Sequence, residues 1–274
     1  MKKIIYLFAF LILISCDNEK KNSTQTPDLT ALLQNAQWID LTYSFDENSV
    51  YWPTNTPFKH DTVFCGINDK GYFYSSFKFS AEEHGGTHFD APIHFSANKN
   101  TIEKVPLLQL KGPGVVVNVA EKALKNRDYL ISVEDFLDWE KKYGRIPDNA
   151  IVLVYTGHDE LYYSNREKCL GTNLTGAAAV PQLHFPGLSA EGAKWLAEER
   201  KINAVGLDTP SIDYGQSSDF MAHRILCEHS LTVYENVANL DKLPESGSYI
   251  IALPMKIKGG SGSPLRIVAI VNKI

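Results

Sequence analysis

The stretch His84-Gly-Gly-Thr-His-Phe-Asp-Ala-Pro-Ile-His94 gathers three histidines and an aspartate, in a chain that has only 8 histidines altogether. In an extended strand, alternate side chains point to the same face, so His84, His88 and Asp90 would all point one way. A helix would also align His84 with His88, but the glycine pair after His84 and Pro92 oppose a helix. The stretch therefore predicts a strand whose polar face is built from imidazole and carboxylate groups.

This combination of side chains is typical of a divalent-metal site. Imidazole and carboxylate groups on one face suit a cation such as zinc or manganese. The alternative is a polar strand edge with two hydrogen-bonded histidines, and the density of ligand types in so few residues favours the metal. His94 follows Pro92 and need not share the direction of the strand, so its function is a separate question.

Four blocks of the sequence resemble one known family. Residues 84–95, which read HGGTHFDAPIHF, resemble the signature of the metal-dependent cyclase family, which includes bacterial kynurenine formamidases, isatin hydrolases and proteins labelled polyketide cyclases. The family's later blocks are matched in order and spacing by residues 206–213, by His223 with Glu235, and by residues 251–266. The similarity runs from about Trp38 to the C-terminus. It implies an α/β protein with a compact swivelling β/β/α domain, in which paired, mixed sheets carry the site.

The resemblance also implies a role for the polar residues of these blocks. The family's metal ligands correspond to His84, His88, Asp90, His223 and Glu235. Asp90 would bridge two ions, so the expected cofactor is zinc or manganese, with two ions in the centre. His94 corresponds to the general base, which takes a proton from the attacking water and returns it to the leaving nitrogen. A fifth ligand or an orienting group is the alternative for His94.

The assignment of His223 and Glu235 requires a turn between them. A continuous helix would place the two side chains about 120° apart. They converge only if the chain breaks, which the β-branched residues after Ser230 favour. Glu228 and His229 are the rival candidates.

Two further groups are candidates for the site. Asp208, Ser211 and Asp213 follow an expected strand end, where they would support the metal, contact the substrate, or form only a structural turn. Trp52, which precedes a proline, resembles the aromatic residue that lines the family's substrate pocket and suits a flat aryl substrate. A core tryptophan is the alternative for Trp52.

Apolar patterns and caps predict much of the remaining structure. Strands are expected over residues 38–43, 72–80, 115–119, 151–155, 249–255 and 265–271. Helices are expected to begin at Ser132 and Ser189. Residues 158–187 form a long connection of weak periodicity, which we expect to serve as a lid or as a contact in a homo-oligomer, a dimer or tetramer.

The N-terminus predicts a targeting segment. Two lysines precede an apolar run over residues 4–14, which is too short to span a bilayer. Leu13-Ile-Ser-Cys16 resembles a bacterial lipobox, so residues 1–15 would form a lipoprotein signal peptide and Cys16 would carry the lipid. An ordinary secretory signal is the alternative.

These features of the N-terminus predict how the chain is divided and where in the cell the protein is located. Residues 16–36 are expected to be a flexible tether, and residues 37–274 the cyclase-like metal-dependent hydrolase domain. The protein is expected in the cell envelope, anchored to a membrane on the periplasmic or outer-surface side. Beyond a lipidated Cys16, three cysteines remain, so at most one disulfide can form. These are Cys65, Cys169 and Cys227; a Cys65–Cys169 pair is one possibility, and Cys227 fits a core position.

Composition and motifs together define the expected function. Hydrophobic residues make up 44% of the 274 residues, as in ordinary globular proteins. A net charge of −5 without a basic run gives no reason to expect a nucleic-acid partner. The leading hypothesis is a metal-dependent hydrolase of a small amide such as N-formylkynurenine. The alternatives are hydrolysis of a cyclic amide, imide or lactone such as isatin, and a non-catalytic binding lipoprotein.

Overall fold

The computed structural model describes residues 28–158 and 163–273. The expected signal peptide, the lipidation site Cys16 and most of the expected tether lie outside these residues. The chain divides into two units, residues 1–34 and residues 35–274, and the second contains the sheets. Over the ranges described, no helix is long and apolar enough to cross a membrane.

The last part of the expected tether is helical. Helix α1 (Leu29–Asn35) lies within residues 16–36, the expected flexible tether, and none of its residues is buried. The backbone N–H of Thr30 donates to the Asp28 carboxylate at 3.0 Å, which satisfies one of the free donors at the start of the helix. The last part of the expected tether therefore contains a short, exposed helix.

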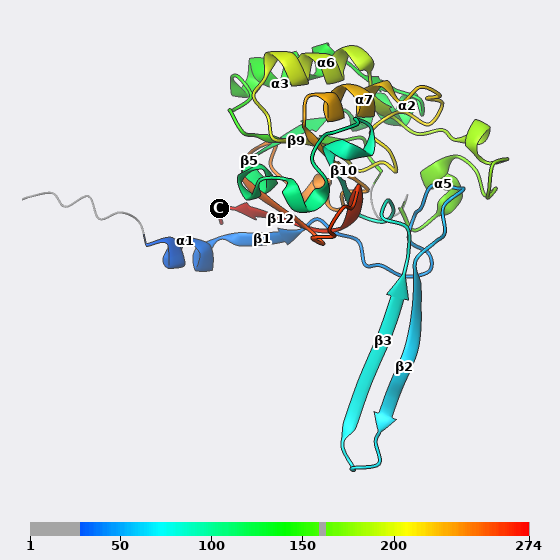
Figure 1. The fold of residues 1–274 in the computed structure, drawn as a ribbon. Coiled ribbons are helices and arrows are strands. Elements are labelled where there is room, and N and C mark those ends of the chain that lie inside the picture. Colours follow the sequence, from blue (N-terminus) through cyan, green and yellow to red (C-terminus); the bar gives the residue numbers. More distant parts are fainter. Residues whose placement is uncertain (1–27, 159–162, 274) are drawn as a thin grey trace, which may run out of the picture. The chain divides into compact units, whose positions relative to one another are not determined.

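One large mixed sheet forms the centre of the second unit (Figure 1). In spatial order its strands are β1 (Gln37–Asp40), β12 (Gly262–Val271), β11 (Ser246–Pro254), β5 (Lys111–Asn118), β7 (Ile151–Tyr155), β9 (Ala204–Leu207), β10 (Thr232–Glu235) and β4 (His88–Asp90). The short β4 also pairs with β12, so the sheet closes on itself like a barrel. Strands β5, β7, β9 and β10 are parallel, and the other neighbours are antiparallel.

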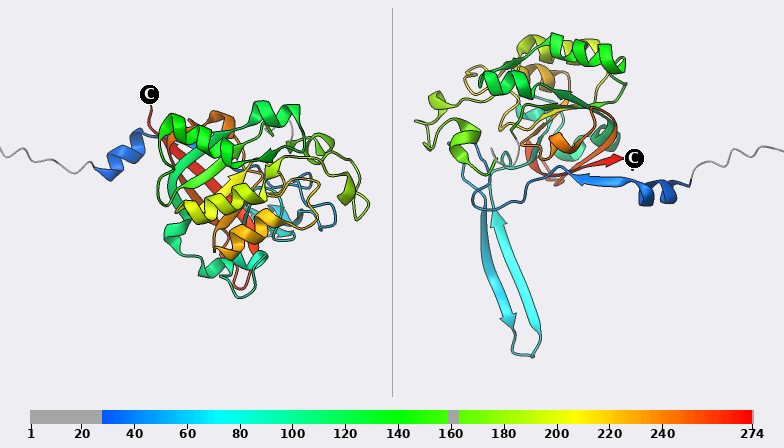
Figure 2. Two further views of the ribbon diagram at one scale, coloured as in Figure 1. Left: turned by 90° about the horizontal axis from the view of Figure 1, so that it is seen from above. Right: turned by 180° about the vertical axis from the view of Figure 1, so that it is seen from behind.

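Helices cover the outer side of the parallel strands, as Figures 1 and 2 show. They are α2 (Ala120–Lys125), α3 (Val133–Tyr143), α6 (Ala190–Glu199) and α7 (Met221–Glu228). Alternate residues of β7 belong to two separate hydrophobic cores. Ile151 and Leu153 pack inside the closed sheet, whereas Val152 and Val154 pack beneath the helices. Burial on both faces explains why this strand is apolar throughout.

The predicted helix starts are confirmed. Ser132 and Asp135 form the capping box of α3, and the Ser189 hydroxyl accepts the Gly192 N–H at 2.9 Å at the start of α6. Short 3-10 helices fill several connections: η1 (Pro92–His94), η2 (Ile102–Lys104), η3 (Leu107–Leu110), η4 (Val180–Gln182) and η5 (Leu240–Lys242). Pro92 begins η1 because its ring fixes the backbone angle that a helix start requires.

A long hairpin stands apart from this sheet. Strands β2 (Lys59–Ile67) and β3 (Phe73–Ser80) pair only with each other, and none of their residues is buried. Figure 1 shows the hairpin extending away from the closed sheet. The strand predicted over residues 72–80 is confirmed, although the exposure of its aromatic residues was not expected.

The long connection after β7 carries its own small core. It contains α5 (Arg166–Leu170), η4 and β8 (Gly187–Leu188), and β8 pairs with β6 (Leu130–Ile131). Cys169 and Phe185 pack there with Val50 and Trp52. Among the described cysteines, Cys169 and Cys227 are buried and Cys65 is exposed, and all three are free. The possible Cys65–Cys169 disulfide is therefore not formed.

Candidate metal centre

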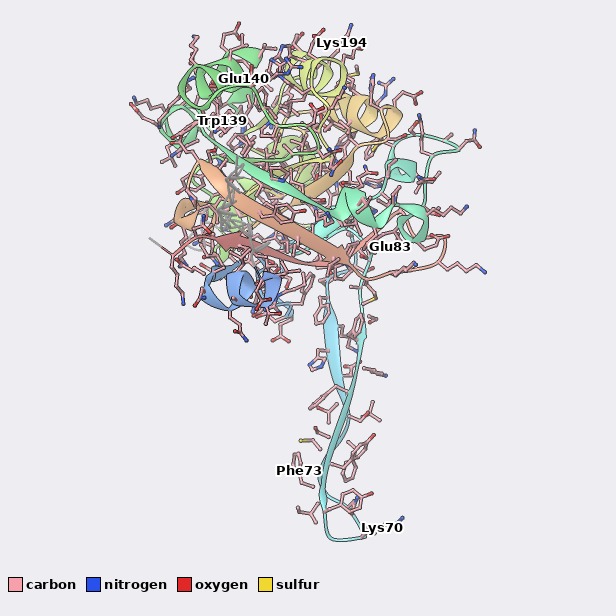
Figure 3. The ribbon with its side chains drawn as sticks, turned by 90° about the vertical axis from the view of Figure 1, so that its left-hand side faces the viewer. Lys70, Phe73, Glu83, Trp139, Glu140 and Lys194 are labelled. Atoms are coloured by element: carbon pink, nitrogen blue, oxygen red, sulfur yellow. The ribbon has the colours of Figure 1, made fainter. Side chains whose placement is uncertain are left out.

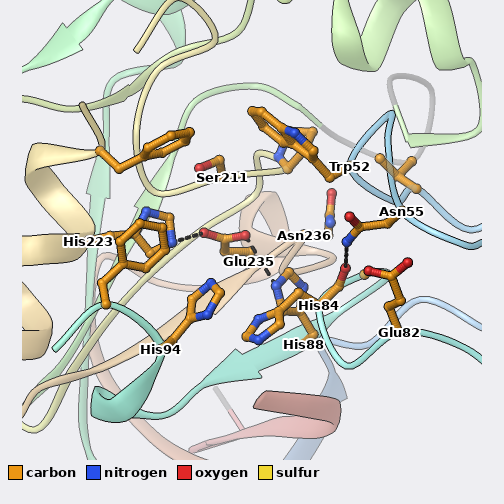
Figure 4. Close-up of a pocket in the computed structure, with 15 residues that line it drawn as sticks. Trp52, Asn55, Glu82, His84, His88, His94, Ser211, His223, Glu235 and Asn236 are labelled. Atoms are coloured by element: carbon orange, nitrogen blue, oxygen red, sulfur yellow. Dashed lines mark hydrogen bonds and ion pairs between the residues drawn. The ribbon is translucent and has the colours of Figure 1, made fainter. Parts of the chain in front are cut away.

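Strands β4 and β10 and helix α7 bring the candidate ligands together (Figure 4). His88 and Asp90 lie two residues apart on β4, and Glu235 ends β10 directly opposite His88. His223 comes from α7, after which Ser230, with φ +59°, turns the chain into β10. The break predicted between His223 and Glu235 is thus present, and their side chains converge.

The single strand expected from His84 to Asp90 is not formed. Only the last three residues of that run are strand, because Gly86 adopts φ +60° and interrupts the extended backbone. His84 nevertheless reaches the centre from the preceding loop. Its Nδ1 lies 2.6 Å from Oδ1 of Asp90.

Two buried carboxylates lie between the histidines. Oδ1 of Asp90 faces His84 and lies 3.3 Å from Nε2 of His88, whereas Oδ2 lies 3.3 Å from Nε2 of His223. Glu235 repeats this arrangement, with Oε2 3.2 Å from His88 and Oε1 3.1 Å from His223. Each carboxylate therefore offers one oxygen to each side of the centre, which is the arrangement that a bridge between two cations requires.

In each of these three histidines, the ring nitrogen that points away from the two carboxylates contacts a separate partner. We call this nitrogen the outer nitrogen. Nδ1 of His88 lies 3.0 Å from the carbonyl oxygen of Gly86, and Nδ1 of His223 lies 2.7 Å from Asp213. Nε2 of His84 lies 2.9 Å from the hydroxyl of Ser261. Histidines that bind metals almost always carry such a partner on the other ring nitrogen. The remaining nitrogens all face the two carboxylates.

The electrostatics of the centre favour positive charge. Burial alone would lower the pKa of His88, but Asp90 and Glu235 raise it to about 10. Burial would also lower the pKa of His223, and hydrogen bonds to Asp213, Asp90 and Glu235 raise it well above its usual value. Protons on these histidines or a divalent cation can supply the charge, so metal binding would displace protons. The donor set fits a divalent metal.

His94 lies beside the candidate ligands but has a different environment. Its ring stacks on His84 with 3.7 Å between centroids, and burial lowers its pKa to about 4, so the ring is neutral near pH 7. A neutral imidazole can accept a proton. Ligand atoms of His94, Asp90 and His223 also lie close enough together to hold an ion, so both alternatives given for His94 are geometrically possible.

A pocket of about 300 Å³ opens onto this centre (Figure 4). Its aromatic wall includes Trp52, Phe95 and Phe220, and the rings of Trp52 and Phe220 meet edge to face with centroids 6.1 Å apart. The polar part of the lining includes Asn55, Glu82, Ser211 and Asn236 besides the histidines and Glu235. Trp52 thus lies at the expected wall for an aryl group, and it also packs against the small core.

Several candidates lie elsewhere. Glu228 and His229 are at the surface, where Glu228 accepts the Ser96 hydroxyl and His229 lies 3.8 Å from Glu198. Asp208 is buried but accepts hydrogen bonds from the Thr156 and His158 backbone. It therefore supports a strand end and not the metal centre.

Two residues that hold the candidate ligands in place were not predicted from the sequence. The Glu83 carboxylate accepts hydrogen bonds from the Ser261 N–H and hydroxyl at 2.8 and 2.7 Å, and Ser261 in turn holds His84. Asn236 donates to the Gly86 carbonyl at 2.9 Å and steadies the loop before β4. The sequence offers no periodic signal for these contacts, because they join segments that are far apart in the chain.

Comparisons with known proteins agree with this geometry. A family described as "Putative cyclase" matches residues 39–214. Isatin hydrolase of Roseibium aggregatum is 29% identical over 80% of this chain and 83% of its own length. Kynurenine formamidase of Bacillus mycoides is 26% identical over 86% of this chain and 98% of its own.

Solved structures give the same result. Isatin hydrolase A from Ralstonia solanacearum superposes with a TM-score of 0.80 at 30% identity, covering 91% of this chain and 99% of that one. An isatin hydrolase bound to the product analogue thioisatinate also has a TM-score of 0.80, at 25% identity, over 89% and 97% of the two chains. The expected α/β fold and metal-dependent hydrolase activity are confirmed, and the chain belongs to the cyclase family.

Proposed function

We propose that the centre binds two divalent ions, zinc or manganese, and that the protein hydrolyses a small aryl amide. The ligands would be His84, His88, Asp90, His223 and Glu235. The observation that carries this proposal is the orientation of the three histidines, whose outer nitrogens are all occupied. Two carboxylates with one oxygen on each side of the centre complete the set.

Each residue of the site would have a distinct task in the reaction. A bound divalent cation would activate the amide carbonyl and the attacking water as a Lewis acid. His94, whose ring is neutral near pH 7, would accept the proton of that water and return it to the leaving nitrogen. Trp52 and Phe220 would hold the aryl group, because flat rings pack against aromatic walls.

N-formylkynurenine is the leading substrate. It combines a formyl-aryl amide with a charged amino-acid group, and the pocket offers partners for both. The aromatic wall suits the aryl ring, and Glu82 lines the same pocket, where its carboxylate could pair with the substrate ammonium group. Relatives named kynurenine formamidase support this choice.

Isatin or another cyclic amide is the second candidate. The isatin hydrolase structures superpose closely on this chain at up to 30% identity. A substrate of this class is flat and uncharged, so it would use the aromatic wall without Glu82. An envelope location would also favour it, because tryptophan breakdown is expected in the cytosol.

A substrate panel separates these candidates. Purified protein would be loaded with zinc or with manganese, and its metal content measured. Hydrolysis of N-formylkynurenine, formanilide, isatin and phthalimide would then be followed. Turnover of the formyl amides supports the leading proposal, and turnover of the cyclic compounds alone supports the second. Full metal content without turnover of any compound would point to the binding lipoprotein.

Glu82→Gln is a sharper test of the substrate class. The glutamine keeps an oxygen that can accept the Thr56 N–H, now 2.6 Å from Glu82, but removes the charge. We expect KM for N-formylkynurenine to rise roughly tenfold, since a hydrogen bond to a charged group contributes about 1.5–3 kcal/mol. Formanilide, which lacks the ammonium group, serves as the control and should be unaffected. An equal change for both substrates would remove Glu82 from ammonium recognition.

We also propose that the protein is an envelope lipoprotein anchored through Cys16. The apolar run and the Leu-Ile-Ser-Cys sequence support this. We propose further that the protein forms a homo-oligomer, a dimer or tetramer. The exposed β2–β3 hairpin supports this, because none of its residues is buried within the chain.

A further inference from the structure

A second pocket, of about 420 Å³, adjoins the one at the metal centre. We call the pocket at the centre the reaction pocket and this one the side pocket. Val50, Trp52 and Asn55 line both of them, so the segment that carries Trp52 forms the wall between the two. Asn55 also donates to the carbonyl oxygen of His84 at 3.4 Å. The side pocket is therefore next to the place where an aryl group would bind.

Tyr51, in the lining of the side pocket, has an unpartnered hydroxyl. Its backbone pairs with Gly85, in the loop that carries the candidate ligands, and a Cβ on Gly85 would lie 2.2 Å from the Tyr51 ring. Tyr51 is only 3% exposed, and its hydroxyl has no hydrogen-bond partner among the residues that the structure describes. Burial raises the pKa of Tyr51 to about 12, so the hydroxyl keeps its proton and can donate a hydrogen bond. Buried polar groups nearly always have a partner, so an unpartnered one is a candidate contact for a ligand.

Arg166 contributes a second unpartnered donor to the same pocket. It is the first residue of α5 and is half-buried. A terminal nitrogen donates to the carbonyl oxygen of Leu174 at 3.3 Å, whereas no described residue accepts the proton of its buried Nε. The guanidinium is permanently charged and can only donate. Glu47 also lines the pocket, but it is exposed, so water screens its charge.

The wall between these donors is fixed by packing. The Tyr163 hydroxyl accepts the Val50 N–H at 3.4 Å, and the Tyr163 ring stacks on Tyr43 with centroids 3.8 Å apart. Val50, Trp52 and Tyr163 also pack against the small core around Cys169. A site whose walls are already ordered binds a ligand without the cost of ordering them.

We propose that the side pocket binds a carboxylate of the substrate whose amide lies at the metal centre. Tyr51 and Arg166 both offer a hydrogen-bond donor without a partner, so the ligand must supply acceptors, and the charge of the guanidinium selects an anion. Carboxylates accept several hydrogen bonds, and arginine is especially suited to binding them. This inference rests on the proposed function, and it narrows the substrate to an aryl amide that also carries a carboxylate.

N-formylkynurenine has this chemistry, whereas isatin has no carboxylate to place in the side pocket. The amino-acid group of N-formylkynurenine carries its ammonium and its carboxylate on one carbon atom. Glu82 and Arg166 line the two adjoining pockets, and the charge of Glu82 contributes to the raised pKa of Tyr51, which places these groups near one another. Opposite charges on the two sides of Trp52 therefore match the amino-acid group.

A matched pair of ligands isolates the carboxylate. Kynurenine and kynuramine share the aryl ketone and the ammonium group, and only kynurenine has the carboxylate. Binding of each to the zinc-loaded full chain would be measured by titration calorimetry, so the readout does not depend on turnover. We expect the wild type to bind kynurenine roughly tenfold more tightly, as for a hydrogen bond to a charged group. Equal affinities, or no binding of either ligand, would overturn the proposal.

Arg166→Gln should abolish this preference, because it removes the charge and Nε. We expect the Kd of kynurenine to rise roughly tenfold and that of kynuramine to stay the same. Arg145→Gln is the control, because Arg145 is exposed and lies beside Glu140, which accepts the neighbouring Ile146 N–H. Figure 3 shows Glu140 among the helices and Glu83, which precedes the candidate ligands, at the base of the hairpin.

The control should keep the preference of the wild type for kynurenine. A preference that survives in Arg166→Gln would mean that the carboxylate binds elsewhere, for instance on the metal, and would overturn the proposal. Equal loss of the preference in Arg166→Gln and Arg145→Gln would overturn it as well.

Tyr51→Phe provides a second test, which removes only the hydroxyl. Because this hydroxyl has no described partner to lose, the variant should unfold at the same temperature as the wild type or a higher one in the absence of ligand. Its Kd for kynurenine should rise roughly threefold to tenfold, as for the loss of a hydrogen bond. A lower unfolding temperature with an unchanged Kd would contradict the role of Tyr51 in binding the carboxylate.

Turnover of N-formylkynurenine on the same preparations separates this inference from the proposed function. Selective binding of kynurenine through Arg166 without turnover of any formyl amide would support the carboxylate site and refute the proposed function. Turnover of N-formylkynurenine with the same KM in the wild type and in Arg166→Gln would support the proposed function and overturn the carboxylate site.

Discussion

Both ring nitrogens of the three candidate histidine ligands have defined partners. Each of His84, His88 and His223 has one nitrogen occupied by a fixed partner and one that faces the carboxylates. The orientation of each ring is therefore set before a cation binds, which lowers the cost of assembling the centre. His94 differs, because it stacks on His84 and remains neutral near pH 7.

His94→Ala should separate chemistry from metal binding. If His94 transfers protons and is not a ligand, the variant keeps its metal and its fold, and turnover falls by roughly 10²–10⁴-fold. His84→Ala is the comparison, and should lose metal and activity together. Metal analysis and steady-state rates on both purified variants decide between these roles. Equal metal loss in the two would make His94 a ligand, and the base would then be another residue.

At the level of elements, the loop before β4 positions the candidate ligands. Gly86 adopts φ +60° and its carbonyl oxygen meets both His88 and Asn236. A Cβ at this position would lie 2.4 Å from the Phe45 ring. Only glycine fits such a turn without displacing its neighbours.

Gly86→Ala should therefore destabilise the fold and weaken metal binding. The left-handed backbone alone costs an alanine about 1–2 kcal/mol, and the clash with Phe45 adds to this. Gly71→Ala in the hairpin turn is the control, because it has φ +83° but open space around it. Thermal unfolding of both variants should show the larger loss for Gly86→Ala. Equal losses would mean that Phe45 moves aside freely.

The sequence predicts the helices, the strands and the candidate ligands better than it predicts the residues that hold those ligands in place. The spacing of His88 and Asp90 along a strand, the cap at Ser132 and the apolar run of β7 are local signals, and the structure contains all three. The turn at Gly86 was missed, because a glycine pair shows that a helix is disfavoured without showing how the backbone bends. The contact of Glu83 with Ser261 joins residues 178 positions apart, and no local pattern encodes it.

For the whole molecule, the main open proposal is its attachment to the envelope. A single lipid chain gives only weak anchoring, so a stable anchor needs the diacylglyceryl group and a further acyl chain on Cys16. A membrane-bound hydrolase would meet its substrate outside the cytosol. This location would favour a cyclic amide over N-formylkynurenine.

Cys16→Ala should abolish this attachment. The variant lacks the thiol that would carry the lipid, so we expect it to leave the membrane fraction or to keep its leader uncleaved. Cys65→Ala, which alters a cysteine on the hairpin, should fractionate like the wild type. Immunoblots of separated membranes and soluble extract provide the measurement. Unchanged fractionation and cleavage of Cys16→Ala would refute the lipoprotein proposal.

The metal content of Asp90→Ala tests the central claim most directly. The two oxygens of Asp90 face opposite sides of the centre, so its loss removes one ligand from each ion and part of the neutralising charge. Elemental analysis of the purified full chain should give two ions per wild-type chain, and far less than this in the variant, together with little hydrolysis. One ion retained at full occupancy would point to a mononuclear centre, and full metal content in Asp90→Ala would contradict the bridging carboxylate outright.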